Sequence, residues 1–181
     1  PYVTETYSNT SDPENEKSFP VCTIKNFPNQ ILHTIHWAKD DFDDFRRMFE
    51  NLNNYSKSKS FLDSLTSYEK QQAKEDIKFI LIDNKIESWK DCAKLSADKF
   101  VDVYVNNILQ LLNNFPKDSQ SDDGSLFWSK GKKCPSPFDF DLDDNNCLGY
   151  IEARTHLLAR CCNLDDNFSK DELKEYLQDY K

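Results

Sequence analysis

The sequence predicts an all-α fold, a multi-helix domain interrupted by one long irregular excursion. Apolar residues recur at spacings of three and four over long stretches, whereas the alternation typical of strands is scarce. The chain of 181 residues is 38% hydrophobic and 30% charged, and its 13 Phe side chains can bury large areas. This length and composition are sufficient for one sizeable core.

The first predicted helix covers about residues 28–50. Asn26 and the pair Phe27-Pro28 supply a start signal, because proline is favoured in the first turn of a helix. Aspartates and arginines fall between the apolar positions, so the helix should be amphipathic. Short helices near 59–65 and 67–83 should follow. The apolar stripe of the first helix consists of Ile31, Ile35, Ala38, Phe42, Phe45 and Phe49.

A long helix is predicted from about Ser88 to Asn114, and Phe115-Pro116 should end it. Residues 117–146 are rich in Asp, Ser, Pro and Gly and are typical of an irregular segment, whose aromatic side chains should attach it to the helices. The long helix carries the stripe Trp89, Ala93, Ala97, Phe100, Tyr104, Ile108, Leu111 and Phe115, and the aromatics of the excursion are Phe127, Trp128, Phe138 and Phe140.

Two further helices complete the predicted fold. One lies near 148–161 and should turn Tyr150, Ile151, Leu157 and Leu158 inward. The other follows the capping-box pattern Ser169-x-x-Glu172, which indicates a helix start. Its apolar residues are Leu173, Tyr176 and Leu177.

Charge and glycine content exclude several classes of function. The net charge is −9, from 32 acidic and 23 basic residues, which argues against nucleic acid or an anionic membrane as the main partner and favours a basic protein surface. The longest apolar run, 79–82, is far too short to span a bilayer. Three glycines cannot form a G-x-G-x-x-G or Walker A loop, so the chain cannot bind ATP by those routes.

Six cysteines and three glycosylation sequons, at Asn9, Asn54 and Asn167, raise the alternative of a secreted disulfide domain. This alternative is disfavoured, because six cysteines are sparse for a small stapled scaffold and sequons arise by chance in an Asn-rich chain. Pro1 in place of an initiator Met instead suggests a fragment of a larger intracellular protein.

Cys22 is the leading candidate for a functional residue. It lies in the run Pro20-Val-Cys-Thr-Ile-Lys-Asn-Phe-Pro-Asn29, just before the first predicted helix. The positive end of a helix dipole and the nearby Lys25 would both favour thiolate over thiol. Spacing alone, however, favours the simpler interpretation that Cys22 is a small buried hydrophobe, as most free cysteines are.

Other candidate sites are weaker. His33 and His36 are more simply packed or solvated side chains than metal ligands, because no set of four ligands surrounds them at standard spacing. Core filling is the preferred interpretation over a metal site for the loose group of Cys147, His156 and Cys161-Cys162. A solvated loop is the preferred interpretation both for the basic residues Lys130, Lys132 and Lys133 and for the acidic run from Asp139 to Asp144, over an anion patch or a calcium site.

The segment around Cys22 resembles the catalytic-cysteine motif of the enzymes that activate ubiquitin and its relatives. The similarity rests on Cys22-Thr-Ile-Lys-Asn26, Phe27-Pro28 and Ile35-His-Trp-Ala-Lys39, and extends to about residues 1–165. Later matches are Asn106-Asn-Ile108, Leu111-Leu-Asn-Asn-Phe-Pro116, Phe127-Trp-Ser129 and Lys132-Lys-Cys-Pro-Ser-Pro137. The chain departs from the family pattern where Lys130-Gly131 replaces Gly-Pro and Lys133 replaces Arg, and in its longer acidic run.

The resemblance, closest to the ubiquitin-specific branch, implies a division of the chain and a chemistry. Residues 1–19 would be a crossover segment from an adenylation domain, and 20–181 a helical catalytic-cysteine half-domain. Cys22 would accept ubiquitin from an acyl-adenylate as a thioester and pass it to a conjugating enzyme, with Thr23, Lys25 and Asn26 in supporting roles.

The same resemblance implies that ATP and Mg are used elsewhere in the full-length enzyme, with no cofactor in this fragment. Ubiquitin, conjugating enzymes and the adenylation domains would be the partners, in cytoplasm and nucleus, and the isolated chain should not turn over. Two alternatives stay open: a non-catalytic helical docking module, and the same chemistry with another ubiquitin-like modifier.

Overall fold

The computed structural model describes residues 30–129 and 132–180, and this part of the chain is all-α, as predicted. Its α-helices are joined by one 3-10 segment, η2 (Lys59–Ser64), and by two π-helical segments, η3 (Phe79–Asp83) and η4 (Asp102–Asn106). The β structure in these ranges is a single isolated bridge between Gln120 and Leu126. The helices are α2 (Ile31–Lys57), α3 (Ser67–Lys78), α4 (Trp89–Val101), α5 (Asn107–Asn114), α6 (Asn145–Cys161) and α7 (Lys170–Leu177).

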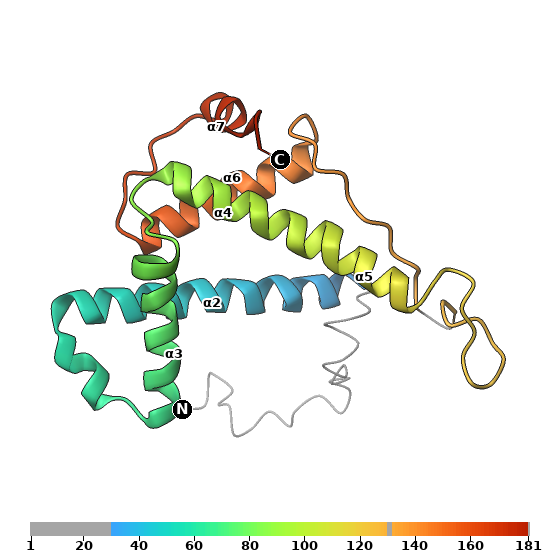
Figure 1. Ribbon diagram of the computed structural model, residues 1–181, viewed down its shortest axis with the longest axis horizontal. Helices are drawn as coiled ribbons and strands as arrows, with labels where there is room; N and C mark the ends of the chain where they lie inside the picture. The colour runs from blue at the N-terminus through green and yellow to red at the C-terminus, as the bar shows by residue number, and fades with distance from the viewer. Residues whose placement is uncertain (1–29, 130–131, 181) are drawn as a thin grey trace, which may run out of the picture.

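The helices are arranged around the pair α4 and α6, which lie side by side (Figure 1). α2 passes along one side of this pair and is crossed by α3, while α7 covers the opposite side. The excursion after α5 projects as an arm and then returns to the start of α6. Helices predicted near 28–50, 59–65, 67–83, 148–161 and after Ser169 are therefore all present, with boundaries shifted by a few residues.

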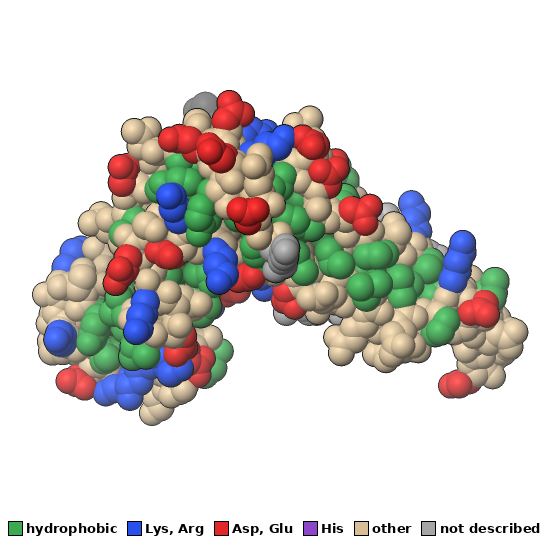
Figure 2. Space-filling view, turned by 45° about the horizontal axis from the view of Figure 1, so that its top comes forward, with side chains coloured by type: hydrophobic (Ala, Val, Ile, Leu, Met, Phe, Trp, Pro, Cys, Tyr) green, Lys and Arg blue, Asp and Glu red, His purple; other side chains and the backbone are tan. Residues whose placement is uncertain are grey.

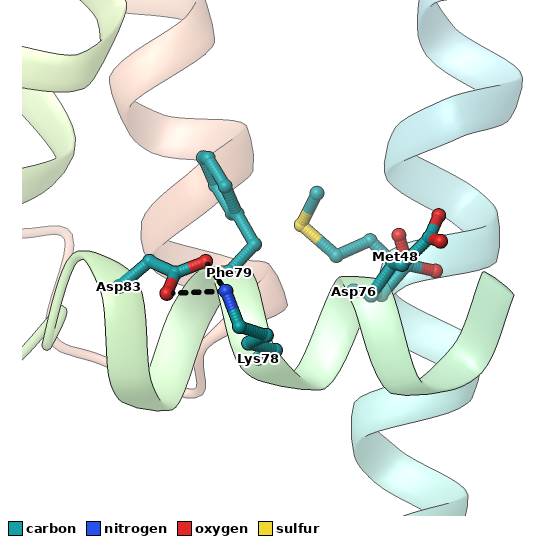
Figure 3. Close-up of a pocket in the computed structure, with 6 residues that line it drawn as sticks. Met48, Asp76, Lys78, Phe79 and Asp83 are labelled. Carbon is teal, nitrogen blue, oxygen red and sulfur yellow. Dashed lines mark hydrogen bonds and ion pairs between the residues drawn. The ribbon is translucent and has the colours of Figure 1, made fainter. Parts of the chain in front are cut away.

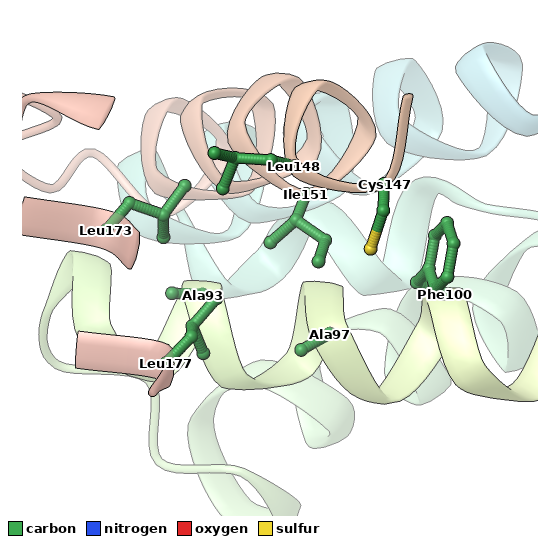
Figure 4. Packing of buried hydrophobic residues seen from close by; sticks show 8 residues of the cluster. All are labelled: Ala93, Ala97, Phe100, Cys147, Leu148, Ile151, Leu173 and Leu177. Carbon is green, nitrogen blue, oxygen red and sulfur yellow. The ribbon is translucent and has the colours of Figure 1, made fainter. Parts of the chain in front are cut away.

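The first core cluster lies between α4, α6 and α7 (Figure 4). Small side chains of α4, Ala93 and Ala97, face Ile151 of α6, and all three are completely buried. Because alanine side chains are short, the two helices approach closely and the larger side chains fill the space between them. The buried members of this cluster are Ala93, Ala97, Phe100, Cys147, Leu148, Ile151, Leu173 and Leu177.

The second core cluster joins the other side of the α4 and α6 pair to α2 and to the end of α3. Its buried members are Phe45, Ile80, Ile86, Cys92, Leu158 and Ala159. Polar contacts reinforce the same junctions. Arg154 of α6 bonds Asp41 of α2 at 3.0 Å and covers the Phe45 ring at 4.6 Å. Asp76 of α3 accepts hydrogen bonds from Arg47 (3.2 Å) and Asn51 (2.7 Å) of α2.

α2 is longer than predicted and only partly buried. Of its predicted apolar stripe, Phe45 is buried, whereas Ile31, Ile35, Phe42 and Phe49 are 46% to 80% exposed. The predicted stripe is therefore only partly covered, because α3 and α6 oppose only part of this long helix. An amphipathic pattern identifies the helix but not how much of it is covered.

The long helix predicted for 88–114 is present, but the π segment η4 divides it into α4 and α5. A π turn adds a residue and so rotates the apolar face that follows it. Ala93, Ala97 and Phe100 are consequently buried before η4, whereas no residue of α5 is buried. The carbonyl oxygen of Tyr104, inside η4, accepts a hydrogen bond from the backbone N–H of Phe138 (3.0 Å).

Aromatic side chains attach the excursion to the helices, as predicted. Phe127 stacks on Phe115 with ring centroids 4.2 Å apart, and Trp128 donates to the carbonyl oxygen of Phe115 at 2.9 Å. Phe138 and Phe140 make edge contacts with Phe100. Hydrophobic side chains are exposed along α5 and this arm (Figure 2). They include Leu109, Phe115 and Leu126, which are 37% to 53% exposed.

The acidic run before α6 is more than a solvated loop, which corrects the preferred interpretation. Asp144 caps α6, because its carboxylate accepts hydrogen bonds from the N–H groups of Asn146 and Cys147, both 2.8 Å. Asp143 forms an ion pair with Lys174 of α7. Asp141 accepts from the N–H of Asp143 at 2.8 Å. These carboxylates fix the start of α6 and the position of α7.

The capping box predicted at Ser169 and Glu172 is confirmed. The Ser169 hydroxyl accepts from the Glu172 N–H (3.2 Å), and the Glu172 carboxylate accepts from the Ser169 N–H (2.8 Å). Leu173 and Leu177 of α7 are buried, whereas Tyr176 is 38% exposed. Among the described helices, none is both long and apolar enough to cross a membrane.

Leu173→Ala should lower the free energy of unfolding by about 2–5 kcal/mol, because it leaves a cavity where α7 meets α4 and α6. Leu109→Ala deletes the same atoms from a helix position that is 50% exposed, and it should change stability by less than about 0.5 kcal/mol. Urea denaturation of both variants measures the difference. Equal losses would show that α7 is not part of the cooperative core.

Candidate functional site

The four predicted site residues, Cys22, Thr23, Lys25 and Asn26, lie outside the described residues. The described chain begins at Gln30, eight residues after Cys22, and Gln30 is the N-cap of α2. The groups that can be placed around the candidate are therefore the N-terminal end of α2 and the cysteine, histidine and acidic side chains of the helices.

The N-terminal end of α2 has unneutralised positive character. The Gln30 side chain does not cap the helix, and no acidic residue lies in the first turn. Since the dipole field falls off within about one turn, the end of a helix favours an anion only close to it. The helix starts at Ile31, three residues later than predicted, so Cys22 is nine positions upstream of its first residue. The effect of the dipole on the Cys22 thiol stays a prediction.

The two histidines of α2 have different environments. His33 is buried, with 2% of its surface exposed, and His36 is exposed. This matches the interpretation of one packed and one solvated side chain. Within residues 30–129 and 132–180, no three His, Cys, Asp or Glu side chains form a group that could hold a metal ion.

Four of the five described cysteines, all except Cys134, belong to the core clusters. Cys92 and Cys147 are completely buried, and Cys134, Cys161 and Cys162 are half-buried. Burial raises the pKa of the Cys147 thiol and raises that of Cys161 to about 11. Core filling is thus confirmed for Cys147, Cys161 and Cys162. They are not one group, however, because Cys147 packs in the first cluster and the other two in the second.

His156 and Asp166 form the arrangement closest to an acid–base pair. His156 Nδ1 lies 3.1 Å from Asp166, which also accepts from Arg160 at 2.7 Å. These bonds, first that of Arg160 and then that of His156, hold the pKa of the Asp166 carboxyl below its usual range. His156 also stacks on Phe168 at 4.2 Å. The group connects the end of α6 to the chain leading into α7, which identifies it as structural.

No sequence motif indicated this group, because its members come from a helix and from an irregular segment.

The sequence also did not show how the basic residues Lys130, Lys132 and Lys133 are arranged. Of these three lysines, Lys130 lies outside the described residues and Lys132 covers the Phe127 ring at 4.2 Å. Lys132 therefore helps to hold the arm together.

An open hollow of about 360 Å³ lies between α2 and the end of α3 (Figure 3). Met48 and the Phe79 ring supply its apolar lining. The charged groups at its rim are engaged with one another or with neighbours: Lys78 bonds Asp83 at 2.7 Å, and Asp76 bonds Arg47 and Asn51. The hollow offers an apolar contact surface and no nucleophile.

A second hollow lies at the surface where α4 meets α7, and its lining includes Lys94, Asp98 and Tyr180. The Tyr180 hydroxyl donates to Asp98 at 2.6 Å, which joins the end of α7 to α4. Neither hollow contains a histidine or a cysteine. The described helices thus form a scaffold, and the candidate nucleophile precedes them.

Comparison with known proteins gives a consistent result. The family "Ubiquitin-activating enzyme, SCCH domain" matches residues 28–181. The chain is 36% identical to human ubiquitin-like modifier-activating enzyme 1 over 98% of the chain, and 43% identical to Schizosaccharomyces pombe ubiquitin-activating enzyme E1 1 over 88% of it. The chain is also 33% identical, over its own whole length, to human ubiquitin-like modifier-activating enzyme 6. It spans 16% to 18% of these relatives.

Cys22 should be alkylated faster than Cys92 or Cys161 in the folded chain near neutral pH. Interaction with the Cys162 side chain, and then burial, raise the pKa of Cys92, and burial raises that of Cys161. Less thiolate is therefore available at these two cysteines, and reagents reach them less often. Timed iodoacetamide labelling followed by peptide mass spectrometry measures the three rates. In urea the rates should converge. A Cys22 that reacts as slowly as Cys92 in the folded chain would favour the docking module.

Proposed function

The chain belongs to the SCCH-domain family of ubiquitin-activating enzymes, and from this premise we propose that Cys22 is the residue that accepts ubiquitin as a thioester. The observation that carries the proposal is the Cys22-Thr-Ile-Lys-Asn26 motif, because the whole-length similarity to one relative includes it. The burial of the described cysteines supports the same choice, since a nucleophilic thiol must be reachable by a protein-sized substrate.

The proposed step is an acyl transfer. The thiolate of Cys22 attacks the carbonyl carbon of the ubiquitin C-terminal acyl-adenylate, a carbon–sulfur bond forms, and the carbon–oxygen bond to AMP breaks. The electron pair leaves on the AMP phosphate. A thiol of a conjugating enzyme then displaces Cys22 by attack on the thioester. Cysteine suits both steps, because a thiolate is a good nucleophile and a better leaving group than an alkoxide.

Three neighbours of Cys22 are assigned supporting roles in this proposal. The Thr23 hydroxyl stabilises the oxygen of the reacting carbonyl, where negative charge develops. Lys25 contributes positive charge, which favours the thiolate. Asn26 orients the backbone between the motif and α2, whose N-cap is Gln30. Sequence neighbours alone supply no general base, so we place the remaining catalytic groups on the adenylation domain.

ATP and Mg are assigned to the rest of the parent protein, since residues of this chain do not fit them. Gly124, Gly131 and Gly149 are too far apart to build a phosphate-binding loop. We propose that residues 1–19 connect the adenylation domain to the half-domain 20–181. This connection must let Cys22 reach an adenylate made elsewhere. On the resemblance alone, we place the parent protein in cytoplasm and nucleus.

The proposed partners are ubiquitin, the conjugating enzymes and the adenylation domain. The net charge of −9 favours contact with a basic protein surface. Because two of the reported relatives are named ubiquitin-like modifier-activating enzymes, the alternative of a related modifier is retained. Offering related modifiers beside ubiquitin distinguishes these two cases.

Cys22→Ser in the full-length parent should abolish the thiol-sensitive ubiquitin adduct that forms with ATP and magnesium. The serine oxygen is a poor nucleophile at neutral pH, and any ester it formed would resist thiols. A non-reducing gel, run beside a reduced sample, measures the adduct. Cys134→Ser, which changes a half-buried thiol of the irregular segment, is the matched control and should keep it. A thiol-sensitive adduct that persists without Cys22 would assign the chemistry to another cysteine.

Thr23→Ala should slow thioester formation by about tenfold or more while leaving the urea midpoint unchanged, because it removes a donor to the reacting carbonyl. Thr23→Ser retains the hydroxyl and should restore most of the rate. Single-turnover kinetics with preformed adenylate measure the step itself. An unchanged rate in Thr23→Ala removes this residue from the mechanism.

A further inference from the structure

A pair of thiols connects α4 to the end of α6, away from the Cys22 motif. Cys92 lies in the first half of α4 and is completely buried. Cys162 is the C-cap of α6, is half-buried and packs against the second core cluster, to which Cys92 belongs. The two side chains pack in the same cluster and interact closely enough for each to shift the pKa of the other. Two sulfur atoms from different elements therefore meet inside the core.

The neighbouring cysteines are directed elsewhere. The sulfur of Cys161 donates to the carbonyl oxygen of Phe45 at 3.6 Å, so this side chain turns toward α2. Cys147, at the opposite end of α6, packs in the first cluster. Cys134 donates to the adjacent carbonyl oxygen of Pro135 at 3.7 Å in the irregular segment. Among the described cysteines, Cys162 is thus the one positioned to react with Cys92.

The environments of the two thiols differ in a way that suits sequential oxidation. Interaction with the Cys92 side chain lowers the pKa of Cys162, which favours the thiolate there. The same interaction and burial raise the pKa of Cys92, so it stays a thiol. Cys162 is also the more exposed of the two, so that a small oxidant can reach it first. The C-terminal end of the α6 dipole disfavours an anion and should keep the reaction slower than at a dedicated redox cysteine.

We propose that Cys92 and Cys162 are a thiol-oxidation site, which hydrogen peroxide converts into a disulfide joining α4 to the end of α6. In the first step the Cys162 sulfur attacks one peroxide oxygen, the O–O bond breaks, and the released hydroxide takes up a proton to become water. In the second step the Cys92 sulfur attacks the resulting sulfenic acid, its proton passes to the leaving hydroxyl, and a second water is released. Two thiols are oxidised and one peroxide is reduced.

The disulfide would hold the second core cluster closed. It links residues 92 and 162, and the segment between them contains α5, the arm and all of α6. A cross-link across so long a segment restricts the unfolded chain and raises resistance to urea. Because the two side chains already interact in the folded protein, α4 and α6 need little rearrangement. The site does not depend on Cys22 or on the proposed thioester chemistry.

The test uses the whole 181-residue chain carrying Cys22→Ser, so that the candidate nucleophile cannot compete. The folded chain is treated with hydrogen peroxide, quenched with catalase, alkylated with N-ethylmaleimide and digested with trypsin without reductant. We expect a disulfide-linked pair of peptides, residues 91–94 with residues 161–170, which separates on reduction. The oxidised chain should also have a higher urea midpoint than the reduced chain.

Single variants identify the partner within the second peptide, which contains two cysteines. The linked pair should persist in Cys161→Ser and disappear in Cys162→Ser. Cys92→Ala should also abolish it, and a urea titration of each variant establishes that the fold is intact. The Cys161→Ser result does not require altering either member of the proposed pair. A linked pair that survives in Cys162→Ser, a Cys161–Cys162 disulfide, or a chain whose Cys162 oxidises to sulfinic acid without linking would each overturn the proposal.

Discussion

The close packing of α4 against α6 is the constraint on which the remainder of the structure depends. Small side chains make it possible, because Ala93 and Ala97 of α4 face Ile151 of α6 without holding the helices apart. The buried hydroxyls of Ser96 in α4 and Thr155 in α6 form their hydrogen bonds within their own helices, so neither needs a partner on the other helix. Ser96 bonds the carbonyl oxygen of Cys92 and Thr155 that of Ile151, each at 2.7 Å within its own helix. The hydroxyls of Ser96 and Thr155 are therefore paired although both side chains are completely buried.

The other elements are attached to this pair by different kinds of contact. α7 adds Leu173 and Leu177 to one side, and α2 and η3 add Phe45 and Ile80 to the other. The arm is held by aromatic stacking and by the bond between Tyr104 and Phe138, which the π segment η4 makes available. Because these attachments are separate, the exposed face of α2 and the exposed apolar side chains of the arm can contact other parts of a larger protein without disturbing the α4 and α6 core.

The sequence was sufficient to predict the helices but not their burial or the interruptions within them. Periodicity located α3 and α6, and the capping box located the start of α7. The π segments were not predicted, since Tyr104 and Ile108 continue the apolar spacing through the added residue. The capping role of Asp144 was missed because the acidic run that contains it resembles any polar loop. The contact between His156 and Asp166 was missed because these residues are ten positions apart and meet only after folding. For the candidate site, the sequence predicted the motif around Cys22, and these residues lie outside the part of the chain that the structure describes.

The placement of the cysteines separates two requirements on a thiol in such a domain. A cysteine between packed helices is a good filler because burial keeps it protonated, and Cys147 and Cys161 follow this rule. A nucleophile that receives a protein-sized acyl group needs the opposite conditions, access and a stabilised thiolate. These conditions are difficult to satisfy inside the α4 and α6 core without weakening it, since an ionised sulfur there would lose its hydration. Under the proposed function the nucleophile is Cys22, which precedes the first described helix in the sequence, so the two requirements fall on different cysteines.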